Sequence, residues 1–185
     1  RSSPVGSVTL PEGATVATLD GAFDQAFVHH SHSLQRLLMA QVDRLPHGLQ
    51  AILKTVSTLG GAFTSKNARD IHARLQLTPR GGQLDDGLLR LRSLHFLDLS
   101  FAMKPPLYSF RSAMQRDVIY ASLTFETRKK LHVAAAECIL EEAASSLTRS
   151  NVVYLAFVHY KAAEHRGQMM MVAADAAQQA ISSGS

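Results

Sequence analysis

The sequence predicts a mainly α-helical chain that contains one small β-hairpin. Apolar residues recur at steps of three and four along residues 34–94 and again after residue 113, which is the spacing of amphipathic helices. Between these stretches, HFLDLSF at residues 95–101 alternates apolar and polar side chains, and LYSF at residues 107–110 follows a Pro-Pro turn. An apolar content of 46% with 18% charged residues is typical of a globular protein.

The first two helices meet at Leu45-Pro46. Pro46 suits the first turn of a helix, where its missing N–H is not needed, and Gly60 suits the position just past a helix end. One helix is therefore expected to end near Arg44 and the next to run from Pro46 to Leu59, with Gly60 just past its end. Their buried faces are predicted from two apolar sets, Leu34, Leu37, Leu38, Val42 and Leu45, then Leu49, Ile52, Leu53, Val56 and Leu59.

Two further short helices precede the hairpin. Ser65 is the expected N-cap of a helix that ends at Leu75, and a third helix is expected over residues 84–94. Three short helices followed by a β-hairpin are the order of a winged helix. Beyond the hairpin the spacing is helical throughout, and Gly167 is the expected turn within a helical hairpin. The helices expected there cover residues 113–122, 125–146, 151–164 and 168–181.

Three regions follow from this pattern. Residues 1–44 form an N-terminal segment, extended from Arg1 to about Thr18 and then helical, with Asp20 as a cap. Residues 45–123 form the predicted winged-helix domain. Residues 124–185 are alanine-rich helices that resemble tetratricopeptide units, with Tyr160, Ala163 and Ala173 at packing positions.

Two runs of residues carry a resemblance to a known family. The first is SLQRLLMAQVDRLPHGLQAILKTVSTLGGAF at residues 33–63, and the second joins YSFRSAM, VIYASL and RKKLHVAAAE between residues 108 and 137. Together they resemble the segment that follows the NTPase core in STAND-type signalling ATPases, including the AAA-like regions of soluble adenylyl cyclases and LuxR/MalT-like regulators. This resemblance implies a winged helix that passes the state of a nucleotide-binding domain to flanking repeats.

The resemblance brings no catalytic residue. The family's Phe-Arg-His triplet stands here as Phe110-Arg111-Ser112, so a hydroxyl replaces an imidazole that can report nucleotide phosphates. Arg111 and Ser112 occupy the positions that the resemblance links to nucleotide sensing, so they are the nucleotide-sensing candidates. The alternative for Arg111 is to connect the hairpin to the next helix. The resemblance implies no cofactor in these residues and places ATP in the parent protein. The candidates for partner binding on the repeat are Tyr154, His159 and Tyr160.

Other reactive patterns have simpler interpretations. GGAFTSK at residues 60–66 lacks the Gly before Lys of a phosphate-binding loop and follows a helix, so it is interpreted as a helix stop and a cap. His29, His30 and His32 lack the further ligands that close a zinc site, so no metal site is predicted. Asp85 and Asp86 stand at a helix start, where acidic residues complement the helix dipole.

Two further patterns lie in the last helices, and one of them is open between alternatives. His132, His159 and His165 are interpreted as structural. Met169 to Met171 indicate a packed helix, or alternatively a surface for a partner helix.

The charge of the chain limits which classes of partner are expected. The net charge of +4 and pI near 9.5 come from scattered cations. The third helix carries Arg90 and Arg92 but also two aspartates, and the only cation of the wing is Lys104. DNA is therefore not the favoured partner. A DNA-binding winged-helix regulator is the alternative function.

Composition also bears on the compartment. The single cysteine, Cys138, favours a reducing compartment, and no apolar run reaches the length of a membrane span. The chain is expected to be a cytoplasmic fragment of a longer protein, because it begins at Arg1 and ends in Ser-Ser-Gly-Ser. Its expected function is regulatory and scaffolding, with protein partners bound through the repeats.

Overall fold

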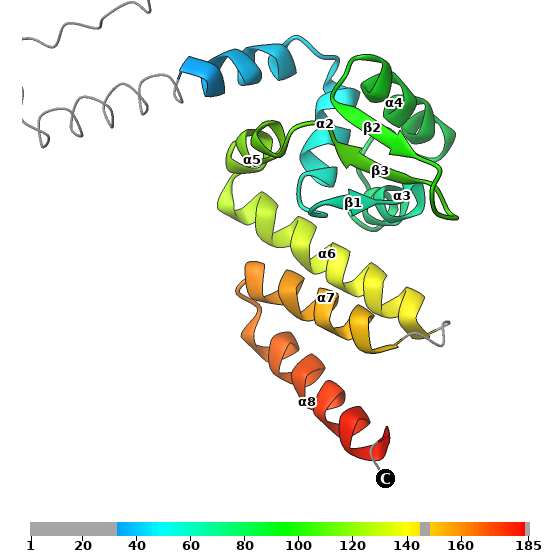
Figure 1. Cartoon of the computed structure of the whole chain (residues 1–185). Coiled ribbons are helices and arrows are strands. Elements are labelled where there is room, and N and C mark those ends of the chain that lie inside the picture. The colour runs from blue at the N-terminus through cyan, green and yellow to red at the C-terminus, as the bar shows by residue number, and fades with distance from the viewer. Residues whose placement is uncertain (1–32, 145–148, 184–185) are drawn as a thin grey trace, which may run out of the picture. The chain divides into compact units, whose positions relative to one another are not determined.

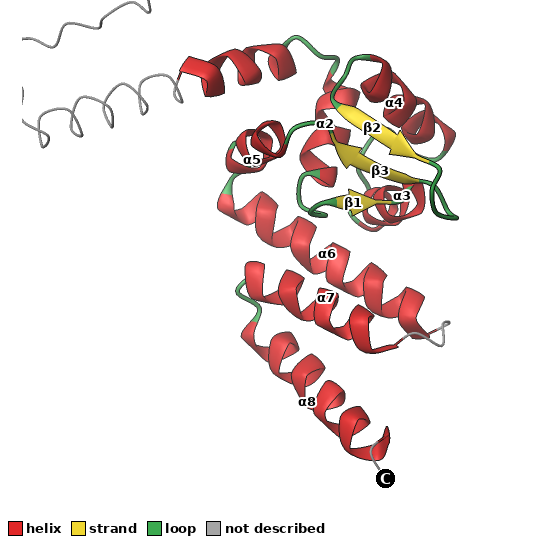
Figure 2. Cartoon of the chain, in the orientation of Figure 1, coloured by secondary structure: helices red, strands yellow, loops and turns green. Residues whose placement is uncertain are grey.

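The computed structural model of the chain describes residues 33–144 and 149–183. The chain divides into two compact units, Arg1–Leu38 and Met39–Ser185, and nearly all described residues belong to the second. The described part is mainly helical and holds a small antiparallel sheet (Figure 2). The predictions for residues 1–18 and for Asp20 lie outside the described residues.

The helices and the hairpin follow the predicted order. A helix over residues 33–43 comes first. The elements after it are α2 (His47–Val56), β1 (Ala62–Phe63), α3 (Ser65–Arg74), α4 (Gly82–Ser93), β2 (Leu97–Ser100), β3 (Leu107–Phe110), α5 (Ala113–Ala121), α6 (Phe125–Ala144), α7 (Arg149–Ala162) and α8 (Arg166–Ser183).

The junction before α2 is held by a side chain. Pro46 is the N-cap, so α2 begins one residue after it. The Gln50 amide donates to the carbonyl of Leu45 at 2.8 Å and to that of Asp43 at 3.3 Å. These bonds satisfy carbonyls that the break between the helices leaves without intrahelical partners. At the other end, the chain leaves α2 through Gly60 with φ +87°, a left-handed conformation that glycine adopts without strain.

The start of α3 corrects one prediction. Thr64, and not Ser65, is the N-cap: its hydroxyl accepts from the backbone N–H of Asn67 at 3.1 Å. The Asn67 carboxamide oxygen in turn accepts from the Thr64 N–H at 2.9 Å. This reciprocal capping box satisfies two orphan donors and leaves Ser65 as the first helical residue.

The sheet contains a strand that the sequence did not indicate. β1 pairs antiparallel with β3, which pairs with β2, so the strand order is β1-β3-β2. Phe63 of β1 lies opposite Tyr108 of β3, and their rings stack with centroids 5.9 Å apart. With two residues, β1 is too short to show an alternating pattern.

The first apolar cluster joins α2 and α4 to the sheet. Gly87 of α4 faces α2 closely: a Cβ at this position would stand 2.3 Å from Cδ1 of Ile52. An alanine there would force the buried terminal methyl group of Ile52 to move. The buried members of this cluster are Val42, Ile52, Leu53, Val56, Phe63, Ala68, Leu84, Leu88, Leu91, Phe96, Leu97, Tyr108 and Ile119.

A second cluster joins α3 to α6. Ile71 of α3 is buried in it together with Leu123, Leu131, Ala134, Ala135 and Cys138. Leu59 packs against both this cluster and the first, so the apolar interior is continuous between them. On the surface, the Arg74 guanidinium reaches Glu137 at 3.1 Å and also contacts Glu141, both on α6. The predicted boundary after Leu123 thus falls between packed helices.

The third cluster joins the last helices. Figure 1 shows α6 and α7 side by side and antiparallel, followed by α8. Ala136, Val153, Ala156, Tyr160 and Val172 are its buried members.

The C-terminal helices correct two predictions. The turn between α7 and α8 lies at Glu164, which has φ +54°, whereas Gly167 is inside α8. Met169 packs against the third cluster, but Met170 and Met171 are exposed, so only one of the three methionines fits the packed-helix interpretation.

Candidate functional site

The two nucleotide-sensing candidates lie at the base of the hairpin. The Arg111 guanidinium donates to Nδ1 of His95 at 2.8 Å, and the Arg111 backbone N–H donates to the Phe96 carbonyl at 3.1 Å. The Ser112 hydroxyl caps α5 by accepting from the N–H of Gln115 at 3.3 Å. Arg111 therefore fastens the residue after β3 to those before β2. Nucleotide sensing by this pair stays a prediction.

The three partner-binding candidates lie on α7 but differ in exposure. Tyr154 is 67% exposed, whereas His159 and Tyr160 are 7% and 2% exposed. Only the Tyr154 side chain is therefore open to a partner in this structure. Leu155 and Val158 are also exposed on α7.

The remaining sequence candidates do not form a reactive centre among the described residues. Asp85 lies in the first turn of α4 and is 3.7 Å from the Arg69 guanidinium, while Asp86 is exposed. His29, His30 and His32 lie outside the described residues. No group of three or more His, Cys, Asp or Glu able to hold a metal ion occurs in the described ranges.

Within residues 33–144 and 149–183, no helix is both long enough and apolar enough to cross a membrane.

A chain of three buried or half-buried polar rings crosses from α5 to α7. The Tyr120 hydroxyl is 2.9 Å from Nε2 of His132, and Nδ1 of His132 is 2.9 Å from Nδ1 of His159. His132 and His159 are only 6% and 7% exposed. The guanidinium of Arg128 lies 5.4 Å from the centre of the Tyr120 ring. The sequence separates these rings by 12 and 27 residues, so the α6–α7 hairpin brings them together.

The short contact between the imidazoles couples their tautomers. A hydrogen bond between two Nδ1 atoms needs one proton, so one ring donates and the other accepts. If His132 donates, its Nε2 accepts from Tyr120 and Nε2 of His159 carries a proton. If His159 donates, its Nε2 is an acceptor and Nε2 of His132 donates to Tyr120. The state of His159 thus fixes the direction of the whole chain.

Burial keeps both imidazoles neutral near pH 7. Burial lowers the pKa of His132 to about 4, and the nearby charge of Arg128 lowers it further. Burial also lowers the pKa of His159 to about 4, with a smaller contribution from His132. The physical cause is that a charged imidazole loses hydration in an apolar interior.

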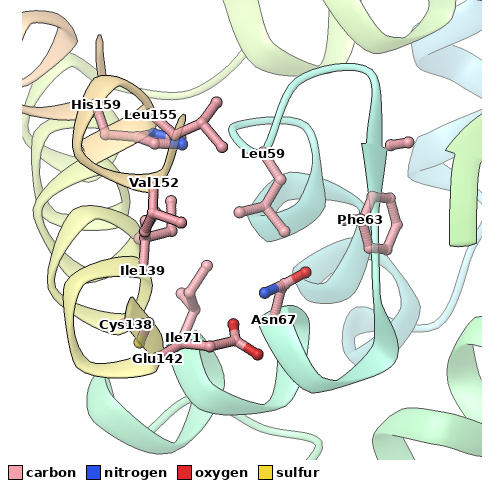
Figure 3. A pocket seen from close by; sticks show the side chains of 12 residues that line it. Leu59, Phe63, Asn67, Ile71, Cys138, Ile139, Glu142, Val152, Leu155 and His159 are labelled. Carbon is pink, nitrogen blue, oxygen red and sulfur yellow. The ribbon is translucent and has the colours of Figure 1, made fainter. Parts of the chain in front are cut away.

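His159 also lines a pocket between α3 and the α6–α7 hairpin. The pocket has a volume of about 460 Å³. Figure 3 shows His159 beside Leu155 toward one end and Asn67 with Glu142 toward the other. The wall between them is largely apolar, formed by Leu59, Ala62, Phe63, Ile71, Ala135, Cys138, Ile139 and Val152.

The polar groups at the second end are held by neighbours. The Asn67 oxygen accepts two hydrogen bonds from Thr64, at 2.9 Å from the backbone N–H and 2.8 Å from the hydroxyl. Glu142 lies 3.6 Å from the ammonium of Lys66, which also pairs with Asp70 at 2.7 Å. The negative charge at this end of the pocket is thus partly balanced.

Comparison with family models, with curated proteins and with solved structures finds no match to this chain. The resemblance to STAND-type ATPases therefore rests on the residues quoted above.

The histidine pair was missed at the sequence level, although a signal exists. His132 and His159 begin the same pattern, His-x-x-Ala-Ala-Glu, in HVAAAE at residues 132–137 and HYKAAE at residues 159–164. A repeated pattern on two antiparallel helices can place matching side chains face to face. The pocket had no comparable signal, because its lining comes from separate elements.

Proposed function

We propose that this chain is a non-catalytic regulatory and scaffolding module of a signalling protein that resembles a soluble adenylyl cyclase or a STAND ATPase. In this proposal residues 45–123 are a winged helix and residues 124–185 are tetratricopeptide-like helices. The element order supports the first part, since three helices, a short strand after α2 and a hairpin lie in winged-helix sequence. The antiparallel α6–α7 pair with small buried residues supports the second.

The observation that carries the proposal is the core shared by α3 and α6. Ile71 is buried against Leu131 and Cys138, and Arg74 bridges to Glu137 on the same helix. A module that passes a conformational change from one neighbour to another needs such a stiff connection, because a flexible linker would absorb the movement. No catalytic residue and no cofactor are assigned to these residues, and ATP would bind in the parent protein.

The surface proposed for protein partners is the set of exposed apolar side chains on the last two helices. It consists of Tyr154, Leu155 and Val158 on α7 and Met170 and Met171 on α8. Aromatic residues and methionine are enriched in protein interfaces, and Tyr154 is 67% exposed with no role in the core.

The test is an affinity capture with the whole chain and two variants, followed by identification of the captured proteins. Tyr154→Asp places a charge on the proposed surface, and Ala113→Asp places one at an exposed site at the start of α5. We expect at least one captured protein to be lost with Tyr154→Asp and retained with Ala113→Asp. The proposal is overturned if no such protein depends on Tyr154, or if Mg-ATP binds stoichiometrically at micromolar affinity in calorimetry.

Binding of duplex DNA is the alternative, and the hairpin gives it little support. Phe101 and Met103 at the loop between β2 and β3 are 69% and 62% exposed, where a DNA-reading wing carries cations for phosphate contacts. On α4, Arg90 and Arg92 are accompanied by an exposed Asp86. Strong binding to duplex DNA that weakens steeply with salt would favour this alternative.

A further inference from the structure

We propose that the pocket between α3 and the α6–α7 hairpin binds a small, uncharged, largely apolar molecule that carries a hydroxyl group, and that Nε2 of His159 receives this hydroxyl. The inference does not depend on the proposed signalling role. It rests on the size of the pocket, its lining and the hydrogen-bonding state of one buried ring.

The size and walls of the pocket fit a small organic molecule. A volume of about 460 Å³ lies within the range of roughly 300–1,000 Å³ that is usual for ligand sites. The walls are aliphatic or aromatic over most of their area, with polar groups concentrated at the two ends (Figure 3). This is the pattern of sites in which apolar contact provides affinity and a few polar groups fix orientation.

His159 supplies a hydrogen-bonding atom at one end. Its Nδ1 is occupied by His132 at 2.9 Å, whereas its Nε2 has no hydrogen-bond partner among the described residues. The residue is only 7% exposed, and it lines the pocket. Nε2 is not among the fully buried atoms that lack a partner, so it keeps accessible surface at which a ligand can add a hydrogen bond.

A hydroxyl is the group that suits both tautomers of this ring. A hydroxyl can donate to Nε2 or accept from it, so it can pair with His159 whichever way the Tyr120–His132–His159 chain is directed. An ether or a carbonyl can only accept and would require one direction.

The same surroundings disfavour a charged ligand. Among the described residues that line the pocket there is no lysine or arginine, and the carboxylate of Glu142 would repel an anion. For a cation, Glu142 is already 3.6 Å from Lys66, so the compensation for lost hydration would be small. An uncharged molecule avoids both costs.

The test uses two probes that differ by one hydroxyl, 2-naphthol and naphthalene, titrated into the whole chain and followed by NMR. We expect both to bind, with 2-naphthol about 3- to 10-fold tighter, which is the usual net value of one hydrogen bond. The ¹⁵N resonance of His159 Nε2 should shift with 2-naphthol and stay nearly fixed with naphthalene. Equal affinities, or no binding of either probe below about 1 mM, would overturn the proposal.

Variants then locate the binding. Ala62 lines the pocket but is exposed, so Ala62→Trp can block the pocket without disturbing the core, and Ala102→Trp places the same ring on the exposed loop between β2 and β3. We expect Ala62→Trp to weaken the binding of both probes at least 10-fold and Ala102→Trp to leave it unchanged.

A third variant tests the role of His159. His159→Phe should abolish the preference for 2-naphthol over naphthalene. If this variant does not fold, the wild-type ¹⁵N shift still decides the role of His159. Unchanged binding to Ala62→Trp would exclude the pocket.

Discussion

The two ends of the Met39–Ser185 unit have different cores. Around α2, α4 and the sheet, the fully buried side chains are large and aliphatic, such as Ile52, Leu88 and Leu97, each 0% exposed. Around α6, α7 and α8, the residues at 0% exposure are small, such as Ala136 and Ala156. In the first end, large side chains fill the space between the elements. In the second end, small side chains let the helices lie close together.

This difference changes what stabilises each end. Burying a leucine or isoleucine contributes about 1.5–3 kcal/mol, but an alanine removes far less apolar area from water. The C-terminal helices therefore depend more on their connection to α3 and on the buried chain of Tyr120, His132 and His159. Buried polar groups that are fully paired fix one arrangement of neighbouring helices, because any other arrangement leaves them unpaired.

The largest predicted effect tests whether the two ends unfold together. Tyr120→Ala removes a half-buried ring from the second cluster and the hydroxyl that pairs with His132, so we expect a loss of about 3 kcal/mol in the free energy of unfolding. The control Tyr120→Phe keeps the ring and should lose about 1 kcal/mol. Denaturant unfolding, followed by one probe at each end, measures both values.

The comparison predicts one shared transition for the wild type and for Tyr120→Ala, because the apolar interior is continuous through Leu59. Two separated transitions, with the variant moving only one of them, would mean that the two ends are independent domains.

An acid-dependent loss of stability is the second prediction. The pKa values of His132 and His159 are lowered in the folded state, so the unfolded chain binds protons first as the pH falls from about 6.5. Stability from the pair is complete above this pH and is lost on the way down toward the folded pKa of about 4. Each histidine corresponds to about 1.4 kcal/mol per pH unit, or about 2 kcal/mol per histidine by pH 5.

His72 serves as the comparison at the other end. It is buried on α3, and burial also lowers its pKa. Its Nδ1 contacts the carbonyl of Pro79 at 3.1 Å, and no second imidazole is paired with it. His159→Asn should therefore make the stability profile shallower between about pH 6.5 and 5, while the residual slope reports on His132 and His72. An unchanged slope in this variant would contradict the assignment to the pair.

The sequence predicts the aliphatic end better than the alanine-rich end. The stripe of Leu49, Ile52, Leu53 and Val56 marks the buried face of α2 without ambiguity, and the change of period at His95 places the hairpin. At the other end the sequence predicts the helices and three packing positions, of which Tyr160 and Ala163 are buried and Ala173 is exposed. Alanine is compatible with buried and exposed faces alike, so periodicity there says little about which face is inside.

The candidate site was mostly beyond the reach of sequence. Tyr160 was expected both to pack and to bind a partner, and the structure shows it 2% exposed. The pocket needs Leu59, Asn67 and Ile71 to face Ile139 and Val152. These contacts depend on how α3 packs on α6. The spacing of apolar residues within one helix does not predict how elements far apart in sequence pack together.

The smallest predicted effect compares one glycine from each end. Replacing a helical glycine by alanine stabilises a helix by up to about 1 kcal/mol when nothing obstructs the new methyl group. Gly167 of α8 has no heavy atom within 4 Å of a built Cβ, whereas at Gly87 of α4 the Cβ would stand 2.3 Å from the buried Ile52. Because this contact lies well inside van der Waals distance, the overpacking cost of about 1–3 kcal/mol should exceed the helical gain.

We therefore expect Gly167→Ala to raise the free energy of unfolding by a few tenths of a kcal/mol, since the position is in the first turn of α8. Gly87→Ala should lower it by about 1 kcal/mol, and Gly87→Ala combined with Ile52→Val should recover part of the loss, because the valine removes the atom that the methyl group meets. Chemical denaturation of the four proteins measures these differences. If Gly87→Ala stabilised the chain as much as Gly167→Ala, α4 would not approach α2 as closely as the first cluster requires, and the aliphatic end would have room for an added methyl group at its tightest contact.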